Sequence, residues 1–125
     1  MTLNRSGRHL IADGVAPSEV LRDKATLELL LLEVAKVAEM QVIDLDLYDV
    51  PEDPTALGEE KFRDPGGITG YAVLTTSHAS IHTFPPSGEF RFDLYSCKDF
   101  EVGAVLRTLC GVLRAKDIVT TDRAR

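Results

Sequence analysis

Hydroxyl and imidazole side chains gather in one stretch of the chain, residues 75–85, which reads Thr-Thr-Ser-His-Ala-Ser-Ile-His-Thr-Phe-Pro. The surrounding segments are apolar, and polar groups among buried strands are costly unless they are paired or used. By residue type, Ser77 and His82 could form a nucleophile and its general base. Such a pattern more often reflects structural roles, with hydroxyls at strand ends and histidines that are hydrogen-bonded within the fold. Residue types alone therefore leave both interpretations open.

Two other histidines and a second cysteine are predicted to have structural roles. His9 begins an apolar strand, and His78 alternates away from Ser77 along a strand, so packing or orientation is expected of both. Cys110 falls on a helix face and is predicted to be a buried structural thiol. No group of Cys and His residues has the spacing of metal ligands, so no metal site is predicted.

The elements that must position these groups follow from the hydrophobic periodicity of the first half of the chain. Residues 9–12 form an apolar strand. Residues 17–40 form a helical stretch with a break near Asp23, because apolar residues recur there at three- and four-residue spacing. Residues 41–48 alternate as a half-buried strand. Residues 50–67 are rich in prolines, glycines and charges, which predicts a long loop.

The second half is predicted to contain more strands and a last helix. The expected strands are 68–75, 80–84, 89–96 and an edge strand at 118–119, with a turn at 85–88. Asp99 is expected to cap a helix that runs to Lys116. Short turns between neighbouring strands imply an antiparallel sheet, and two amphipathic helices would cover one of its faces. The predicted fold class is an α+β two-layer sandwich.

The composition narrows the partners and the cellular setting. The chain has 125 residues, a net charge of −6 and a pI near 5.0, with no run of Lys or Arg. Neither nucleic acid nor a membrane surface is therefore a predicted partner. Two cysteines are too few for a disulfide framework, the polar start lacks a signal-peptide core, and the leucines at 29–32 cannot span a bilayer. A soluble, cytoplasmic protein is expected.

Three segments carry a resemblance to a known family. They are Ser-Gly-Arg-His-Leu-Ile-Ala-Asp at 6–13, Thr-Ser-His-Ala-Ser-Ile-His-Thr-Phe-Pro at 76–85, and Asp-Leu-Tyr-Ser-Cys at 93–97. In these motifs, and in the spacing of Ser77, His82 and Cys97, the chain resembles the prokaryotic S-adenosylmethionine decarboxylases. The resemblance covers most of the chain apart from an inserted segment at 52–66. It implies a single decarboxylase domain over 1–125 and a homodimer of αββα architecture.

The resemblance also implies that the chain makes its own cofactor. Ser77 would attack the carbonyl carbon of Thr76, and elimination would then separate residues 1–76 from residues 77–125. The second chain would begin with a pyruvoyl group derived from Ser77. Such a ketone can form a Schiff base with the amine of a small amino-acid-like substrate, and it accepts electrons as carbon dioxide leaves.

Three further side chains receive roles by the same resemblance. His82 matches the base that assists self-cleavage, and Thr69 keeps a hydroxyl where the family has a serine that aids processing. Cys97 matches the residue that protonates the product after decarboxylation. A cleaved dimer of this kind would act in polyamine biosynthesis, where putrescine and spermidine are formed.

The sequence departs from the family pattern at positions that contact the substrate or the scissile bond. Thr76 replaces the usual glutamate before the scissile serine. Pro86 replaces a glutamate that binds the ribose of the substrate, and Val50 replaces a phenylalanine that stacks on adenine. Phe84 keeps an aromatic ring where the family has tryptophan. The loss of the ribose acceptor and of one adenine contact argues against S-adenosylmethionine as the substrate.

The acidic inserted segment offers another substrate contact. Glu59 and Glu60 could bind a distal ammonium or guanidinium group, although a solvated surface loop is the commoner meaning of such charges. The favoured function is a pyruvoyl-dependent decarboxylase of L-ornithine or L-arginine. The alternatives are a decarboxylase of S-adenosylmethionine itself and an uncleaved, non-catalytic homologue that binds or regulates a partner.

Overall fold

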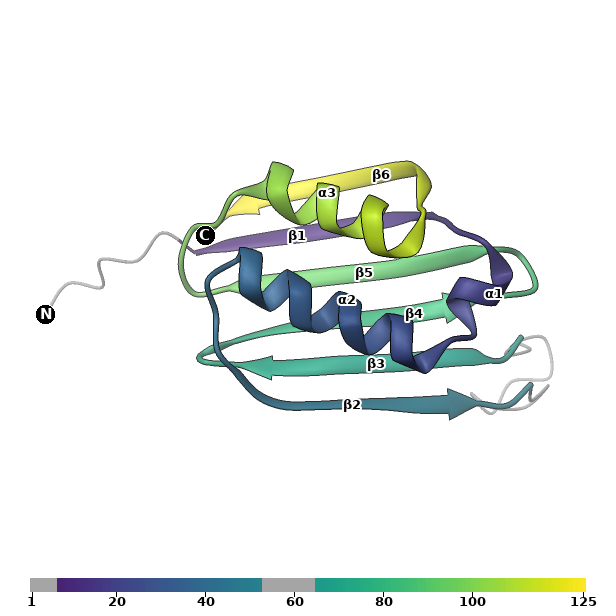
Figure 1. Cartoon of the computed structure of the whole chain (residues 1–125). Coiled ribbons are helices and arrows are strands. Elements are labelled where there is room, and N and C mark those ends of the chain that lie inside the picture. Colours follow the sequence, from purple (N-terminus) through teal and green to yellow (C-terminus); the bar gives the residue numbers. More distant parts are fainter. Residues whose placement is uncertain (1–6, 53–64) are drawn as a thin grey trace, which may run out of the picture.

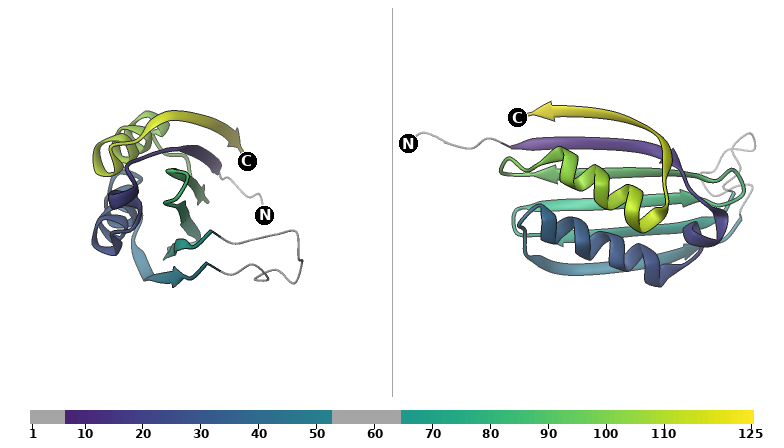
Figure 2. Two further views of the ribbon diagram at one scale, coloured as in Figure 1. Left: turned by 90° about the vertical axis from the view of Figure 1, so that its right-hand side faces the viewer. Right: turned by 45° about the horizontal axis from the view of Figure 1, so that its top comes forward.

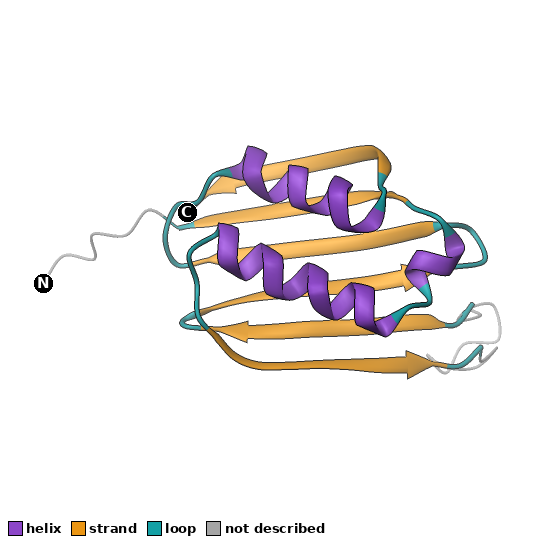
Figure 3. Cartoon of the chain, viewed as in Figure 1, coloured by secondary structure: helices purple, strands orange, loops and turns teal. Residues whose placement is uncertain are grey.

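Six strands and three helices make up the part of the chain that the structure describes, residues 7–52 and 65–125 (Figures 1 and 3). In this computed structural model the elements in chain order are β1 (Arg8–Val15), α1 (Ser18–Leu21), α2 (Lys24–Val37), β2 (Val42–Val50), β3 (Gly67–Leu74), β4 (Ser77–Phe84), β5 (Glu89–Ser96), α3 (Val102–Leu113) and β6 (Lys116–Ala124). The predicted α+β class is confirmed.

The strands form one sheet in the order β2-β3-β4-β5-β1-β6, and every neighbouring pair is antiparallel. β1 lies between β5 and β6, so the first strand is paired on both sides by strands from the second half of the chain. β3 and β4 form a hairpin in which Leu74 pairs with Ser77, and only Thr75 and Thr76 connect the two strands. The start of β4 is therefore held by a tight turn at one end of the sheet.

The helices cover one face of the sheet and leave the other face open (Figure 2). The apolar stripe of α2 and the inward residues of the strands bury each other, and Phe90 and Phe92 are the largest fully buried side chains. Burial of each such side chain stabilises the fold by about 1.5–3 kcal/mol. Within the described residues, no helix has the length and hydropathy needed to cross a membrane.

The predicted break near Asp23 is present and divides the first helical stretch into α1 and α2. Asp23 is the N-cap of α2 and accepts a hydrogen bond from the Ala25 N–H at 3.3 Å. The predicted start of β4 at Ser80 was three residues late, because the short hairpin carries the pairing back to Ser77. The last strand is longer than the predicted 118–119, since β6 pairs with β1 along most of its length.

Three predictions about the last helix were wrong. Asp99 does not cap α3, whose N-cap is Glu101, because the Asp99 carboxylate is bound by Arg8 instead. The helix ends at Leu113 rather than at Lys116, since Arg114 adopts a left-handed conformation that ends the helical ladder. Cys110 is exposed rather than buried, because it lies away from the apolar stripe that α3 turns toward the sheet.

Candidate active site

One group of predicted reactive side chains lies where β4 begins, and we call Thr76, Ser77 and Cys97 the scission cluster. Ser77 is only 7% exposed, because its side chain points to the face that the helices cover. Its Oγ accepts a hydrogen bond from the Cys97 N–H at 3.0 Å, and Thr76 Oγ1 lies 2.9 Å from Cys97 Sγ. Cys97 therefore contacts both residues of the predicted cleavage site, Ser77 through its backbone N–H and Thr76 through its thiol.

The segment after β5 presents Cys97 to this cluster and is anchored from the first strand. Arg8 Nε donates to Asp99 Oδ1 at 2.6 Å, and Arg8 Nη1 donates to Asp122 Oδ1 at 2.7 Å. The hydrogen bond from Arg8, helped by one from the Phe100 N–H, lowers the pKa of the Asp99 carboxyl. The same bond to Asp99, together with that to Asp122, raises the pKa of Arg8. Sequence reasoning missed this anchor, because its members are far apart in the chain.

A second group, Thr69 and His82, lies near the other end of the same hairpin, and we call it the histidine cluster. The two residues stand directly opposite each other on β3 and β4. Thr69 Oγ1 lies 3.0 Å from His82 Nδ1. A partner on one ring nitrogen orients the imidazole and determines which tautomer is present. The family resemblance implied that each of these residues assists self-cleavage, and the structure brings the two side chains into contact.

The two clusters do not meet within one chain. Ser77 and His82 are five positions apart on β4, which corresponds to about 16 Å at ~3.3 Å per residue. An odd separation on a strand also places side chains on opposite faces. Ser77 is buried toward the helices, whereas His82 is exposed on the open face. His82 of one chain therefore cannot act as the base for Ser77 of the same chain in this arrangement.

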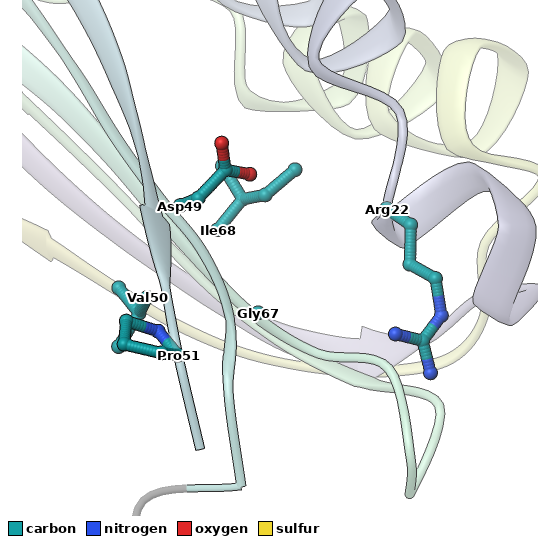
Figure 4. A pocket seen from close by; sticks show the side chains of 6 residues that line it. All are labelled: Arg22, Asp49, Val50, Pro51, Gly67 and Ile68. Atoms are coloured by element: carbon teal, nitrogen blue, oxygen red, sulfur yellow. The ribbon is translucent and has the colours of Figure 1, made fainter. Parts of the chain in front are cut away.

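The candidate substrate-binding residues lie at the histidine-cluster end of the sheet. Val50 ends β2 and pairs with Gly67, while Phe84 ends β4 and pairs with Glu89. A pocket of about 310 Å³ adjoins Val50 and is lined by Arg22, Asp49, Val50, Pro51, Gly67 and Ile68 (Figure 4). Glu59 and Glu60 lie outside the described residues.

Figure 4 shows Arg22, from the end of α1, across the pocket from Asp49 at the end of β2. The Asp49 carboxylate forms an ion pair with Lys24. Pro86 is exposed in the turn between β4 and β5, where the Gly88 N–H bonds to the Phe84 carbonyl. The Pro86 side chain has no atom that can accept a hydrogen bond.

Aromatic and basic side chains surround the other end of the open face, and the sequence analysis gave no role to Tyr95, Asp93 or the arginines among them. His78 and Tyr95 are register partners with ring centres 5.5 Å apart, and His9 packs edge-on against Tyr95 at 6.4 Å. His9 Nε2 lies 2.9 Å from Asp93 Oδ2. A cavity of about 410 Å³ is lined by His9 and residues 123–125. Alternation along β5 was the available signal, since it places Tyr95 and Asp93 on one face.

Comparison with known proteins gives a consistent answer. The sequence pattern of the S-adenosylmethionine decarboxylase family matches residues 8–125. The S-adenosylmethionine decarboxylase proenzyme of Pyrobaculum aerophilum is 35% identical over 94 residues, which are 74% of this chain and 66% of that protein. The proenzyme of the same name from Caldicellulosiruptor saccharolyticus is 27% identical over 121 residues, which are 95% of this chain and 87% of that protein.

A solved structure shows the same fold. The crystal structure of the adenosylmethionine decarboxylase from Aquifex aeolicus superimposes with a TM-score of 0.75, over 98% of this chain and 92% of that chain, at 24% sequence identity. The alignment with the Pyrobaculum aerophilum relative spans just under two thirds of its length, 66%. Because the family pattern extends over residues 8–125, the chain belongs to the S-adenosylmethionine decarboxylase family.

Proposed function

We propose that this chain is the precursor of a pyruvoyl-dependent decarboxylase that cleaves itself between Thr76 and Ser77. The observation that carries the proposal is the scission cluster. Ser77 Oγ is held by the Cys97 N–H at 3.0 Å, next to an exposed hairpin turn that contains the scissile bond. A buried hydroxyl beside an exposed, tightly turned peptide suits intramolecular attack, because the attacking atom and its target are already positioned.

The cleavage chemistry can be written in full from these residues. Ser77 Oγ loses its proton to a base and bonds to the Thr76 carbonyl carbon, while the bond from that carbon to the Ser77 nitrogen breaks and the nitrogen takes a proton. Loss of the Ser77 Cα proton then breaks the Cβ–Oγ bond and releases Thr76 as a carboxylate. Addition of water and departure of ammonia leave the ketone of a pyruvoyl group at position 77. The products are residues 1–76 and 77–125.

The base in this scheme comes from a second copy of the chain. His82 points to the open face of the sheet and lies about 16 Å along β4 from its own Ser77. When two open faces pack around a two-fold axis that runs across the strands, the Ser77 end of one sheet lies over the His82 end of the other. In such a homodimer His82 of each chain lies at the Ser77 end of its partner. Because Ser77 Oγ faces the helices in the uncleaved chain, its proton reaches that imidazole only when the exposed turn rotates the Ser77 side chain toward the open face.

The charges on the open face favour the same arrangement. His9, Arg123 and Arg125 lie at the Ser77 end of β1 and β6. Asp13 and Glu89 lie at the opposite end, where Arg91 bridges them at 3.4 and 3.6 Å. A two-fold axis across the strands brings basic and acidic ends together, which steers association and selects the orientation.

In the mature enzyme the pyruvoyl group supplies the electron sink that makes loss of carbon dioxide possible. The residues of the scission cluster then supply the proton that takes the place of the lost carboxylate. Cys97 Sγ lies beside the cleavage position in the uncleaved chain, 2.9 Å from Thr76 Oγ1. A thiol at this place is suited to protonate the carbon that has lost its carboxylate.

For the substrate we propose L-ornithine or L-arginine, which would place the enzyme in polyamine biosynthesis. Pro86 is exposed and offers no acceptor for ribose hydroxyls, and Val50 has no aromatic face for adenine. Phe84 and Tyr48 are aromatic side chains at that end. On the β2 edge of the sheet Asp44 and Asp46 are exposed, and they lie toward the Ser77 end and the middle of the sheet. Carboxylates suit a distal ammonium or guanidinium group.

Two measurements test this proposal. Intact mass under denaturing conditions is expected to give two chains, 1–76 and 77–125, the second with a pyruvoyl terminus. Release of carbon dioxide is then measured with ornithine, arginine and S-adenosylmethionine side by side, and the first two are expected to be preferred. A preference for S-adenosylmethionine would keep the enzyme class and reject the substrate. A single intact chain without carbonyl reactivity would indicate the non-catalytic homologue instead.

A further inference from the structure

Thr76 has a backbone conformation that its side chain disfavours. Its φ is +56°, in the left-handed region. Of the described residues other than glycine, Glu39, Arg114 and Asp117 also have positive φ, but none of them is branched at Cβ. A β-branched residue in this region is a genuine outlier, because its Cβ substituents crowd the neighbouring carbonyl.

The surrounding structure holds Thr76 in this conformation. Leu74 and Ser77 pair across the hairpin, so only two residues make the turn, and such turns usually place Gly, Asn or Asp where φ is positive. The Thr75 N–H bonds to the Gln41 carbonyl at 3.0 Å and fixes the other turn residue. Thr76 Oγ1 donates to the Thr75 carbonyl at 2.7 Å and contacts Cys97 Sγ at 2.9 Å. Burial does not impose the conformation, since Thr76 is exposed.

We infer that Thr76 is a positioning residue for self-cleavage, and that the β-branched side chain in a left-handed turn strains the peptide bond that breaks. The inference rests on the proposed function. When the Thr76–Ser77 bond breaks, Thr76 becomes a chain end and its backbone is free to leave the left-handed region. The strain present in the uncleaved chain is then released, and the part released on the way to the transition state accelerates the reaction.

This role also accounts for the departure from the family pattern at position 76. Glutamate is unbranched at Cβ and carries a charge, whereas threonine brings a branch and a hydroxyl. A branched residue raises the energy of the uncleaved turn without any additional catalytic group.

Cleavage kinetics distinguish the effect of the Cβ branch of Thr76 from the effect of its hydroxyl. Full-length chain is produced by brief cell-free synthesis, and the intact fraction is followed by mass spectrometry. Thr76→Gly removes both the branch and the φ penalty, and is expected to cleave about tenfold more slowly, equivalent to about 1.4 kcal/mol in the barrier. Thr76→Val keeps the branch and loses the hydroxyl, and is expected to stay within about threefold of the natural chain. Equal slowing of both variants, or a Gly variant as fast as the natural chain, would overturn the inference.

A stability measurement guards against variants that simply fold poorly. In an uncleavable Ser77→Ala background, Thr76→Gly is expected to raise the thermal unfolding midpoint, because glycine accepts positive φ without strain. The matched change Thr75→Gly is expected to lower it, since the φ of Thr75 is not positive and glycine adds only unfolded-state entropy. A Thr76→Gly chain that is destabilised like Thr75→Gly would contradict the strain. If the natural chain itself stays uncut, the proposed function fails; if it cuts and the Gly variant cuts equally, only this inference fails.

Discussion

The scission cluster and the histidine cluster lie on the same strand and differ in what completes them. At the start of β4, the reactive groups contact one another within one chain, as the 3.0 Å bond from the Cys97 N–H to Ser77 Oγ illustrates. Toward the end of β4, His82 has a local partner in Thr69 but faces away from the helices, on the uncovered side of the sheet. A strand with alternating faces thus separates nucleophile from base, and we infer that association of two chains reunites them.

The largest effect is expected from removing the nucleophile. Ser77→Ala deletes the only atom of the scission cluster that can form the ester, so cleavage and decarboxylation are both expected to be lost. Intact mass and carbon dioxide release measure this directly. Ser80→Ala is the matched control, because Ser80 is a hydroxyl of the same strand on the open face, and it should still be cut. A fully active Ser77→Ala chain would reject the pyruvoyl mechanism.

The next effect tests whether the two clusters belong to different chains. His82→Ala alone is expected to slow cleavage by about 10²–10⁴, the usual contribution of a general base. Co-production with the Ser77→Ala chain should restore it, because a mixed dimer pairs an intact Ser77 with an intact His82. With random pairing at equal amounts, about half of the His82→Ala chains are expected to be cut. Absence of any restoration in verified mixed dimers would mean that His82 serves its own chain.

A smaller effect is expected from the partner of the imidazole. Thr69→Val removes the hydroxyl that lies 3.0 Å from His82 Nδ1 and keeps the shape of the side chain. Cleavage is expected to slow by about tenfold, since one hydrogen bond contributes about 1 kcal/mol and also selects the tautomer. Thr69→Ser keeps the hydroxyl and should retain most of the rate. If Val and Ser variants behave alike, the hydroxyl does not orient His82.

The smallest effect concerns stability at low pH. The pKa of Asp99 is lowered in the folded chain by its bond to Arg8, so the carboxylate contributes stability above the ordinary aspartate pKa of about 3.9. That contribution is lost as the pH falls through the lowered value. Denaturant unfolding at about pH 7 should therefore show Asp99→Asn less stable than the natural chain, and the difference should vanish near about pH 2. Asp117→Asn, at an exposed aspartate of β6, serves as the control. A stability difference for Asp99→Asn that persists in acid would exclude the charge effect.

The sequence alone predicted helices and strands well where their hydrophobic periodicity was strong. It predicted them poorly where their extent depends on contacts between residues far apart in the chain. Apolar spacing identified α2 and the alternating strand β5, since each pattern repeats over several turns or residue pairs. The extent of β6 was not predictable, because it depends on pairing with β1 at the other end of the chain. Asp99 was assigned as a helix cap for the same reason, since nothing local reveals that Arg8 binds it.

For the site, the sequence by itself determined which reactive groups exist and, through family resemblance, which belong together. The structure places Thr69 in contact with His82 and the Cys97 N–H on Ser77 Oγ, and the roles of these residues stay predictions. Only the tertiary structure decided that the two pairs lie on opposite faces and ends of β4, and that Thr76 occupies a left-handed turn. The physical reason is that a sequence specifies only the order and spacing of residues along the chain, whereas strand register and hairpin geometry determine where each side chain points.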